Sequence, residues 1–553
     1  TPEKLDILVK SKHPFVEQLK LLVVDEAHGL QEYDRGAKLE LLLAMLRKEH
    51  RNLRILMLSP FMKNADNISQ WLSGDRGHEV FVDWKGSYTL DKIKRNGRYT
   101  GEITYIPSSL NTMYSSEFKV RINDSKRKNI TKTEQSIYIA EKYEKLGGVL
   151  ILCVKKIIAE GLIKKFLYRD VLKKEKLDEL KFLLDLVEKE MGKECLLYES
   201  IRRGCAYHHS SLPLIIREEI EEAISKQLIT IVAATTTLAQ GMNFPISTVI
   251  FQGVNIPSSG YSRKMTTSEF WNIAGRAGRA LVDKEGHIIV ICNNDSDKED
   301  FEKYLRYKNQ EVISSLLNML ENVPEDGINK YWIRQHKELS ALLQYIHHIL
   351  LIDPNIEIDD LLRGSLVYHQ LEANNDRELG EKLLRLTQNY IYKLDNELKR
   401  KKLMESIDKT GLSSISMNML LIKLGRETIE IDDKILFDYN DTKLERLIDI
   451  INEIPEINLS LYNSQGFSAK LVASITKDWV NGKTLREIAS NIDIGKSSEL
   501  DEKINVCGEY IYSKLINNLP WGMSAVQRAS SIVRGKEGHY NNILVPSYIY
   551  FGV

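Results

Sequence analysis

The stretch "LKLLVVDEAHGL" at residues 19–30 decides the fold of the N-terminal part of the chain. Four apolar residues, Leu21 to Val24, are followed by the carboxylates Asp25 and Glu26 and then by His28. A short apolar run with polar boundaries predicts a buried strand. Functional side chains of parallel sheets gather where such strands end. We therefore expect Asp25 and Glu26 to form a site at the end of a strand, with ordinary surface acids as the alternative.

Apolar runs of the same kind recur along the first 295 residues. "LRILMLSP" (53–60) and "HEVFVDW" (78–84) are two of them, and "GAKLELLLAMLRKEH" (36–50) has apolar residues at helical spacing. Further along the chain, buried strands are predicted for "GGVLILCV" (147–154), "LITIVAAT" (228–235), "STVIFQGV" (247–254) and "GHIIVICN" (286–293). Strands that alternate with helices imply a parallel sheet, so we expect an α/β fold.

Changes in this pattern predict the domain boundaries. Residues 1–85 alternate between strands and helices, and 86–135 read as a linker or a small β extension. The alternation resumes over 136–295, with a Lys/Glu/Leu-rich helical insertion near 156–203. From about 296 the chain is mainly helical. There, "SAKLVASITKDWV" (468–480) and "TLREIASNI" (484–492) flank a turn, which indicates either packing in a helical bundle or a DNA-reading helix-turn-helix.

The composition is typical of a soluble globular protein. The 553 residues include 77 Lys+Arg and 77 Asp+Glu, and this neutral total leaves nucleic-acid binding open because a local basic surface suffices. The five cysteines form no CxxC pair, which argues for a reducing compartment without a disulfide framework. No apolar stretch reaches the length of a membrane span, and "TPEKLDILVK" contains no signal-peptide apolar region. We expect a cytoplasmic protein with no membrane partner.

The stretch "EFWNIAGRAGRA" (269–280) contains two Gly-Arg pairs, Gly275-Arg276 and Gly278-Arg279. Their spacing predicts that both guanidinium groups lie on one helix face or in one tight turn. Arginine forks suit phosphate oxygens. Glycines inside a plain surface helix would cost about 1 kcal/mol each without a purpose. The stretch therefore predicts a phosphate-binding element rather than a charged surface helix.

Three other polar stretches carry weaker signals. "AATTTLAQGMNFP" (233–245) follows a predicted strand and offers hydroxyl and amide donors to phosphates, unless it is an ordinary loop. His208-His209 in "CAYHHSSLP" (205–213) has no further ligands at suitable spacing, so we do not interpret it as a metal site. We interpret His347-His348 as part of a helix surface.

In their order along the chain, these motifs resemble those of superfamily-two helicases, in the branch of the exosome-associated Ski-type RNA helicases and the archaeal repair helicases. The resemblance is carried by "TPEKLD", "VVDEAHGL", "RGAKLELLLA", "LSPFMKNADNISQWL", "YHHSSLPLIIREEIEEAI", "TTTLAQGMNFP" and "NIAGRAGR". It covers residues 1–295 well and 296–553 only in architecture. It implies two RecA-like motor domains with parallel sheets, the first incomplete (1–85) and the second at 136–295. A winged-helix-like helical domain (296–400) and a helical bundle (401–553) would follow.

The resemblance also implies roles for single residues. It assigns catalysis of ATP hydrolysis to Asp25, Glu26, His28, Arg276 and Arg279. Asp25 would hold Mg²⁺ through water, and the two arginines would reach the γ-phosphate. The implied nucleotide-binding residues are Gly241, Asn243, Asn272 and Gly275. The residues implied to face the nucleic-acid backbone are Thr1, Pro2, His208, Thr235 and Thr237.

The sequence departs from the family pattern at three places. The Ser-Ala-Thr motif of the family reads Ser59-Pro60-Phe61, which puts the coupling of hydrolysis to unwinding in doubt. The usual glutamine before "GRAGR" is Asn272. The phosphate loop G-x-x-x-x-G-K-[ST] does not occur, since Gly482-Lys483-Thr484 and Gly495-Lys496-Ser497 lack its first glycine. Because "TPEKLD" resembles a motif deep within the first RecA-like domain, we expect the chain to begin inside that domain.

We therefore expect the C-terminal part of an ATP-dependent helicase that moves 3′-to-5′ on single-stranded DNA or RNA. Three hypotheses stay open: a fragment of an active helicase, a split motor completed by a separate chain with the phosphate loop, and a non-hydrolysing nucleic-acid-binding or scaffold subunit. RNA processing, DNA repair and antiphage defence are all possible processes.

Two physical consequences follow from an incomplete first domain. Half of a RecA-like sheet should expose an edge strand and an apolar face, which would make residues 1–85 the least stable part. We also expect no ATP hydrolysis by this chain alone.

Overall fold

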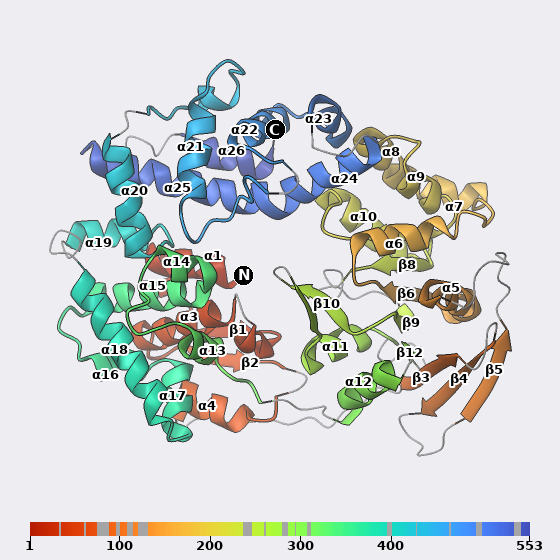
Figure 1. The fold of residues 1–553 in the computed structure, drawn as a ribbon, viewed down its shortest axis with the longest axis horizontal. Coiled ribbons are helices and arrows are strands. Elements are labelled where there is room, and N and C mark those ends of the chain that lie inside the picture. The colour runs from red at the N-terminus through yellow and green to blue at the C-terminus, as the bar shows by residue number, and fades with distance from the viewer. Residues whose placement is uncertain are drawn as a thin grey trace. The chain divides into compact units, whose positions relative to one another are not determined.

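The structure is a computed structural model, shown in Figure 1. It describes residues 1–32, 35–59, 62–74, 88–95, 100–107, 114–119, 131–235, 246–258, 261–278, 286–292, 295–306, 311–394, 401–426, 429–463, 466–493, 500–535 and 543–552. The chain divides into two compact units. The first comprises residues 1–81, 309–483 and 514–553, and the second comprises 82–308 and 484–513.

The second unit is built on one sheet of eight described strands, in the order β5-β4-β3-β12-β9-β6-β8-β7. The strands are β3 (Tyr88–Arg95), β4 (Thr100–Pro107), β5 (Tyr114–Lys119), β6 (Gly148–Leu152), β7 (Cys205–His208), β8 (Ile231–Ala234), β9 (Ile246–Phe251) and β12 (Gly286–Cys292). From β3 to β7 all neighbours are parallel, whereas β4 and β5 add antiparallel strands at one edge. The four strands predicted between 147 and 293 are confirmed, and β7 is an additional strand inside the His-His stretch.

Helices cover this sheet and connect its parallel strands (Figure 1). The helices of this unit are α5 (Lys132–Tyr143), α6 (Lys156–Lys164), α7 (Lys174–Glu179), α8 (Lys181–Met191), α9 (Leu196–Ile201), α10 (Leu214–Ser225), α11 (Thr267–Ala274), α12 (Asp295–Arg306), α23 (Leu485–Asn491) and α24 (Leu500–Tyr510). Of these, α23 and α24 come from the segment 484–513 and connect no described strands. A hairpin of β10 (Asn255–Ser258) and β11 (Tyr261–Lys264) precedes α11. The predicted insertion began at 156, but α6 buries Ala159, Leu162 and Ile163 and is therefore part of the core.

The first unit contains the N-terminal strand–helix elements. They are α1 (Pro2–Lys10), α2 (Pro14–Glu17), β1 (Leu21–Val24), the 3-10 helix η1 (Ala27–Gln31), α3 (Gly36–Glu49), β2 (Arg54–Met57) and α4 (Ala65–Ser73). As predicted, β1 and β2 pair in parallel, with Val23 opposite Leu56. The third predicted strand, 78–84, lies outside the described residues.

The remaining elements of the first unit are helical. They are α13 (Ser315–Asn322), α14 (Lys330–Gln335), α15 (Lys337–Ile352), α16 (Ile358–Leu362), α17 (Leu366–Ala373), α18 (Arg377–Lys393), α19 (Lys401–Asp408), α20 (Ser414–Arg426), η5 (Asp433–Leu436), α21 (Lys443–Asn452), α22 (Ala469–Val480), α25 (Ile516–Val533) and α26 (Val545–Phe551). A π-helical turn, Ile511–Leu515, joins α24 to α25. Among the described residues of 296–400 no strand occurs that would form the wing of a winged helix. No described helix is long and apolar enough to cross a membrane.

The N-terminal elements share their core with helices that lie far away in sequence. Leu42 and Leu46 of α3 belong to the same buried cluster as Leu342 and Ile346 of α15. Glu40 of α3 is fully buried, and its carboxylate accepts hydrogen bonds from Ser314 Oγ (2.5 Å) and Val367 N (2.7 Å). Burial raises the pKa of Glu40 to about 7, although these donors oppose the shift. Residues 1–81 are therefore part of a larger folded unit.

One face of the β1–β2 sheet is open to solvent. Leu21, Val23, Leu56 and Leu58 alternate along the strands and are each 45–50% exposed. Alternating positions of a strand point to the same face. On the opposite face Val24 is buried and belongs to a cluster with Leu43 of α3. Four exposed apolar side chains therefore line this face of the two strands.

The interpretation of His347-His348 as helix surface was wrong. Both side chains are buried in α15, at 1% and 2% exposure. His348 Nδ1 lies 2.7 Å from Asp408 Oδ2, and its Nε2 lies 2.9 Å from Glu49 Oε1. These two carboxylates outweigh the effect of burial and raise the pKa of His348 to about 9. The pair of histidines therefore holds α15 against α3 and α19.

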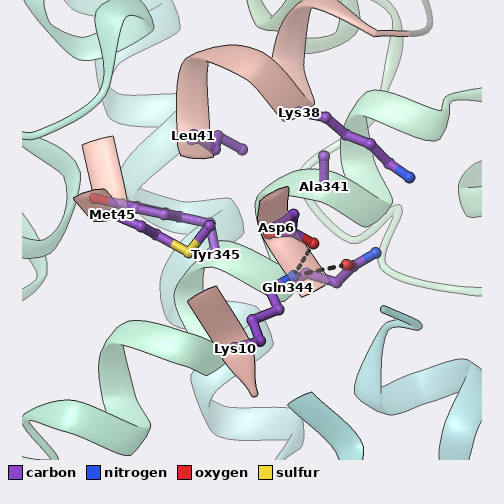
Figure 2. A pocket seen from close by; sticks show the side chains of 8 residues that line it. All are labelled: Asp6, Lys10, Lys38, Leu41, Met45, Ala341, Gln344 and Tyr345. Atoms are coloured by element: carbon purple, nitrogen blue, oxygen red, sulfur yellow. Dashed lines mark hydrogen bonds and ion pairs between the residues drawn. The ribbon is translucent and has the colours of Figure 1, made fainter. Parts of the chain in front are cut away.

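Helix α1 is held against α15 by a buried lysine (Figure 2). Lys10 Nζ donates to Asp6 Oδ2 (2.8 Å) and to Gln344 Oε1 (3.1 Å). The same small pocket is lined by Lys38 of α3, whose ammonium lies 5.3 Å from the ring centre of Trp521. These contacts fix the orientation of the helix that begins with the "TPEKLD" stretch.

Candidate nucleotide and nucleic-acid sites

The predicted acids lie directly after β1. Asp25 is exposed, and its Oδ1 accepts a hydrogen bond from the backbone N–H of Glu26 at 2.9 Å. Glu26 has left-handed backbone angles (φ 51°, ψ 47°), which are uncommon for a residue other than glycine. Such conformations concentrate at functional sites, where surrounding structure enforces them. The backbone turns sharply here, so that both carboxylates lie at the end of the strand.

His28 connects these acids to the end of β2. The histidine is 6% exposed, and its Nδ1 lies 3.4 Å from Glu26 Oε2 and 3.5 Å from Ser59 Oγ. The backbone reinforces this link, since Ala27 N donates to Leu58 O at 2.8 Å. The "DEAH" and "SPF" stretches are therefore in contact through His28. Pro60 and Phe61 lie outside the described residues.

The Gly-Arg stretch is described as far as Gly278, so the prediction that places both guanidinium groups on one helix face or in one tight turn is not tested. Helix α11 starts with a capping box of Thr266 and Glu269 and ends at Ala274. Arg276 lies two residues beyond the helix end, and Gly278 has φ +82° and donates its N–H to Ile246 O at 2.9 Å. Only glycine adopts such a φ without strain. Asn272 lies in α11 and is half-buried, and Gly275 is exposed at the end of the helix.

The sheet separates the two groups of predicted residues. Ala277 forms a bridge with Ile246, the first residue of β9, so Arg276 lies near the amino-terminal edge. His208 and Thr235 lie at the carboxyl-terminal ends of β7 and β8, which pair in parallel. His208 and Thr235 thus lie at the carboxyl ends of strands, whereas Arg276 lies near the opposite edge. The implied nucleotide and nucleic-acid residues therefore lie at different edges of the sheet.

His208 and Thr235 are both buried, at 2% and 9% exposure. His208 Nε2 lies 2.9 Å from Glu221 Oε1, and burial lowers the pKa of this histidine despite that partner. Thr235 N donates to His208 O at 3.2 Å. Because both side chains are buried, their contact with a nucleic-acid backbone stays a prediction.

Lys156 and Ser211 are two further polar residues at this edge that the sequence motifs do not include. Lys156 begins α6, just beyond the carboxyl end of β6, and its Nζ donates to Ser211 Oγ at 2.7 Å. Ser211 follows β7 and precedes α10. The sequence contains a signal for this position, because Lys155-Lys156 directly follows a predicted buried strand, although the predicted insertion at 156–203 includes Lys156. These lysines add positive charge to the edge that holds His208 and Thr235.

The other predicted site residues fall into two groups. Thr1 caps α1 and Pro2 is its first residue, so both lie at an exposed or half-buried helix start in the first unit. Arg279, Gly241, Asn243 and Thr237 lie outside the described residues.

The residues after β1 fit an outer-shell magnesium site. Asp25 is an exposed carboxylate at the end of a parallel strand, where oxygen ligands suit Mg²⁺ that keeps several waters. Asp25 and Glu26 could therefore contact the water shell of a metal–nucleotide complex without a rearrangement of β1.

Comparison with known proteins agrees with this arrangement. The DEAD/DEAH box helicase family matches residues 1–68, and the helicase conserved C-terminal domain matches residues 172–281. The chain is 28% identical over 318 residues to the ATP-dependent DNA helicase Hel308 of Pyrococcus horikoshii, which covers 58% of this chain and 41% of that protein. It is also 28% identical over 340 residues to Hel308 of Methanococcus vannielii, covering 61% and 42%.

A bacterial relative shows the same level of similarity. The Hachiman protein HamB of Bacillus cereus is 28% identical over 352 residues, covering 58% of this chain and 30% of HamB. The matches thus span less than half the length of these relatives. The two helicase domain models thus match regions of the chain that contain parallel strands, at residues 1–68 and 172–281.

Proposed function

We propose that this chain is part of an ATP-dependent helicase that translocates 3′-to-5′ on single-stranded DNA or RNA in the cytoplasm. The contact of Glu26, His28 and Ser59 carries the proposal, because it joins the implied catalytic acid to the motif implied in coupling. The Hel308 relatives are ATP-dependent DNA helicases, which supports ATP as the substrate. The similarity to HamB supports a defence role as one possible setting.

In this proposal the acids and arginines act on the phosphates of ATP. Asp25 orients the water shell of the metal, and Glu26 orients the attacking water. Bound Mg²⁺ would neutralise charge on the phosphate oxygens. Arg276 and Arg279 stabilise the charge that develops on the transferred group, as arginines do in related motors. Asn272, Gly275, Gly241 and Asn243 contribute to the nucleotide-binding surface.

The nucleic-acid strand contacts the carboxyl-terminal edge of the larger sheet. Lys156 offers an ammonium group suited to phosphate oxygens, and the buried Ser211 accepts a hydrogen bond from it. His208 and Thr235 lie at this edge. The resemblance also implies contacts with the nucleic-acid backbone for Thr237, Thr1 and Pro2. DNA and RNA both present phosphate oxygens, and contacts with these oxygens do not read the bases. The proposal therefore covers DNA and RNA alike.

A second polypeptide segment completes the ATP site. The sequence contains no G-x-x-x-x-G-K-[ST], so the phosphate loop comes from elsewhere in a longer chain or from a separate subunit. The open face formed by Leu21, Val23, Leu56 and Leu58 supports this, because apolar strand faces are normally covered. This chain alone is then inactive in ATP hydrolysis.

An unwinding assay tests the proposed function. The complete motor, with the segment that supplies the phosphate loop, is mixed with duplexes that carry either a 3′ or a 5′ single-stranded overhang, in DNA and in RNA. We expect ATP-dependent separation of the 3′-overhang substrate only, and its loss in Glu26→Gln. Strand binding without ATP-dependent separation of any substrate would contradict the proposal.

A further inference from the structure

Lys156 of the second unit contacts two polar side chains, those of Ser211 and Glu509. Its side chain is 25% exposed, and Nζ lies 2.7 Å from Ser211 Oγ. An ammonium group has three donors, so it can bind a further acceptor beside this hydroxyl. In the proposed function that acceptor is a phosphate oxygen of the single strand.

In the structure a carboxylate already occupies this position. Glu509 Oε1 lies 2.8 Å from Lys156 Nζ, and the glutamate side chain is 47% exposed. Glu509 lies near the end of α24, in the segment 484–513 that follows the long helical region. Lys156 therefore bridges the loop after β7 and the carboxylate of a distant helix.

The backbone of α24 is held close to the same loop. A Cβ atom on Gly508 would lie 2.3 Å from Ser211 O, so only glycine allows this approach. One turn earlier, Asn505 Nδ2 donates to Glu160 Oε2 at 3.3 Å, and Glu160 Oε1 lies 3.0 Å from His209 Nε2. These contacts fix α24 on the surface beside Lys156, so the position of Glu509 follows from the packing of its helix.

We propose that Glu509 takes the place of a nucleic-acid phosphate on Lys156 and is displaced when the single strand binds. The inference rests on the proposed function. Phosphate and carboxylate are both negative, so they cannot share one ammonium at contact distance without mutual repulsion. Glu509 thus lowers the affinity of this edge for single strands. The ion pair between Glu509 and Lys156 must break before a phosphate can bind Lys156.

The experiment measures the affinity of the chain for fluorescein-labelled oligothymidine and oligouridine of about 20 nucleotides, longer than a single contact site. Fluorescence anisotropy is recorded for the wild type and for Glu509→Gln, Lys156→Ala and the double variant over a series of salt concentrations. Glu218→Gln is the matched control, since Glu218 is an exposed glutamate on α10 of the same unit and the substitution removes the same charge. Thermal unfolding confirms that each variant is folded.

We expect Glu509→Gln to bind about three- to fivefold more tightly, the range that an exposed ion pair allows. A plot of the logarithm of its affinity against the logarithm of the salt concentration should also be steeper, by up to about one released counterion. The reason is that Lys156 then contacts a phosphate directly on binding. Glu218→Gln should change the affinity by less than half of the change that Glu509→Gln produces. In the Lys156→Ala background the gain from Glu509→Gln should be lost.

The outcomes separate this inference from the proposed function. If Lys156→Ala weakens binding while Glu509→Gln leaves it unchanged or weaker, the carboxylate is only a structural ion-pair partner. The inference then fails and the nucleic-acid function stands. If no variant binds either oligonucleotide, both fail. A gain in Glu509→Gln that persists without Lys156 would show a general charge effect and also overturn the inference.

Discussion

Ser59 Oγ lies 3.5 Å from Nδ1 of His28, so the end of β2 touches the segment that carries the two acids after β1. The same imidazole nitrogen lies 3.4 Å from Glu26 Oε2. His28 is buried and shared between the carboxylate and the hydroxyl. A change at one strand end can therefore reach the other through a single side chain.

This relationship predicts unequal effects of two substitutions on ATP hydrolysis stimulated by single strands. His28→Ala removes the link to Glu26 and should lower the stimulated rate at least about tenfold. Ser59→Ala removes only a contact at the long limit of hydrogen bonding and should lower it less than about threefold. Steady-state rates of the complete motor check this, with Ser11→Ala in the loop after α1 as the control. Equal losses in the first two variants would contradict the ranking.

The open face of β1 and β2 predicts that a polar substitution is tolerated at Val23 but destabilises the fold at the adjacent Val24. Val23 is 50% exposed and Val24 is 8% exposed. Val→Thr replaces a methyl by a hydroxyl of nearly the same size, so the pair is matched. In this chain Val23→Thr should lower the free energy of unfolding by less than about 0.5 kcal/mol, and Val24→Thr by about 1–2 kcal/mol. Urea unfolding measures both.

Hydrogen exchange tests the same feature in another way. The sequence predicts that residues 1–85 are the least stable part of the chain. Among the described elements of this segment only β1 and β2 have an exposed apolar face, so we expect low stability of these two strands and not of α3. Amides of β1 and β2 should exchange quickly, whereas α3 should be protected because it lies in the core with α15. Adding the segment that supplies the phosphate loop should slow exchange in both strands. Strands that are already the best protected part of the chain would contradict the open-face account.

Buried His348 predicts a loss of stability in alkaline solution. Its pKa is about 9 in the folded chain, against 6.5 for an ordinary solvent-exposed histidine, so folding favours the protonated form. This contribution is complete below pH 6.5 and is lost as the pH rises through about 9. His348→Gln should remove this part of the pH dependence of the urea midpoint.

His347→Gln is the matched control for this titration. His347 is the neighbouring buried histidine on α15, but its Nε2 lies 3.0 Å from the carbonyl oxygen of Met404, and burial lowers its pKa. The decrease of the urea midpoint between pH 6.5 and 9 should persist in this variant, because His348 is unchanged. A wild-type midpoint that does not change over that window would refute the assignment of His348 as a buried cation.

Local pattern predicted the strands and the order of the motifs, but not the contacts between distant segments. The apolar runs before Lys155 and Thr235 are buried strands of the large sheet, whereas the run before Asp25 is a strand with one face exposed. By contrast, His348 meets Glu49 across 299 positions, and Asn505 meets Glu160 across 345. No periodicity encodes such pairs, because they depend on how whole helices pack. His348 was therefore assigned to a surface, and Lys156 was not recognised as a site residue.

The most direct test of the central claim is ATP hydrolysis by two samples, each with and without single-stranded DNA or RNA. One is this chain alone, and the other also contains the natural segment or subunit that carries G-x-x-x-x-G-K-[ST]. The account predicts turnover only in the second sample, a higher rate with the single strand, and loss of activity in Glu26→Gln and Arg276→Ala. Strand-stimulated turnover by this chain alone, or strand binding without hydrolysis by the completed sample, would contradict it.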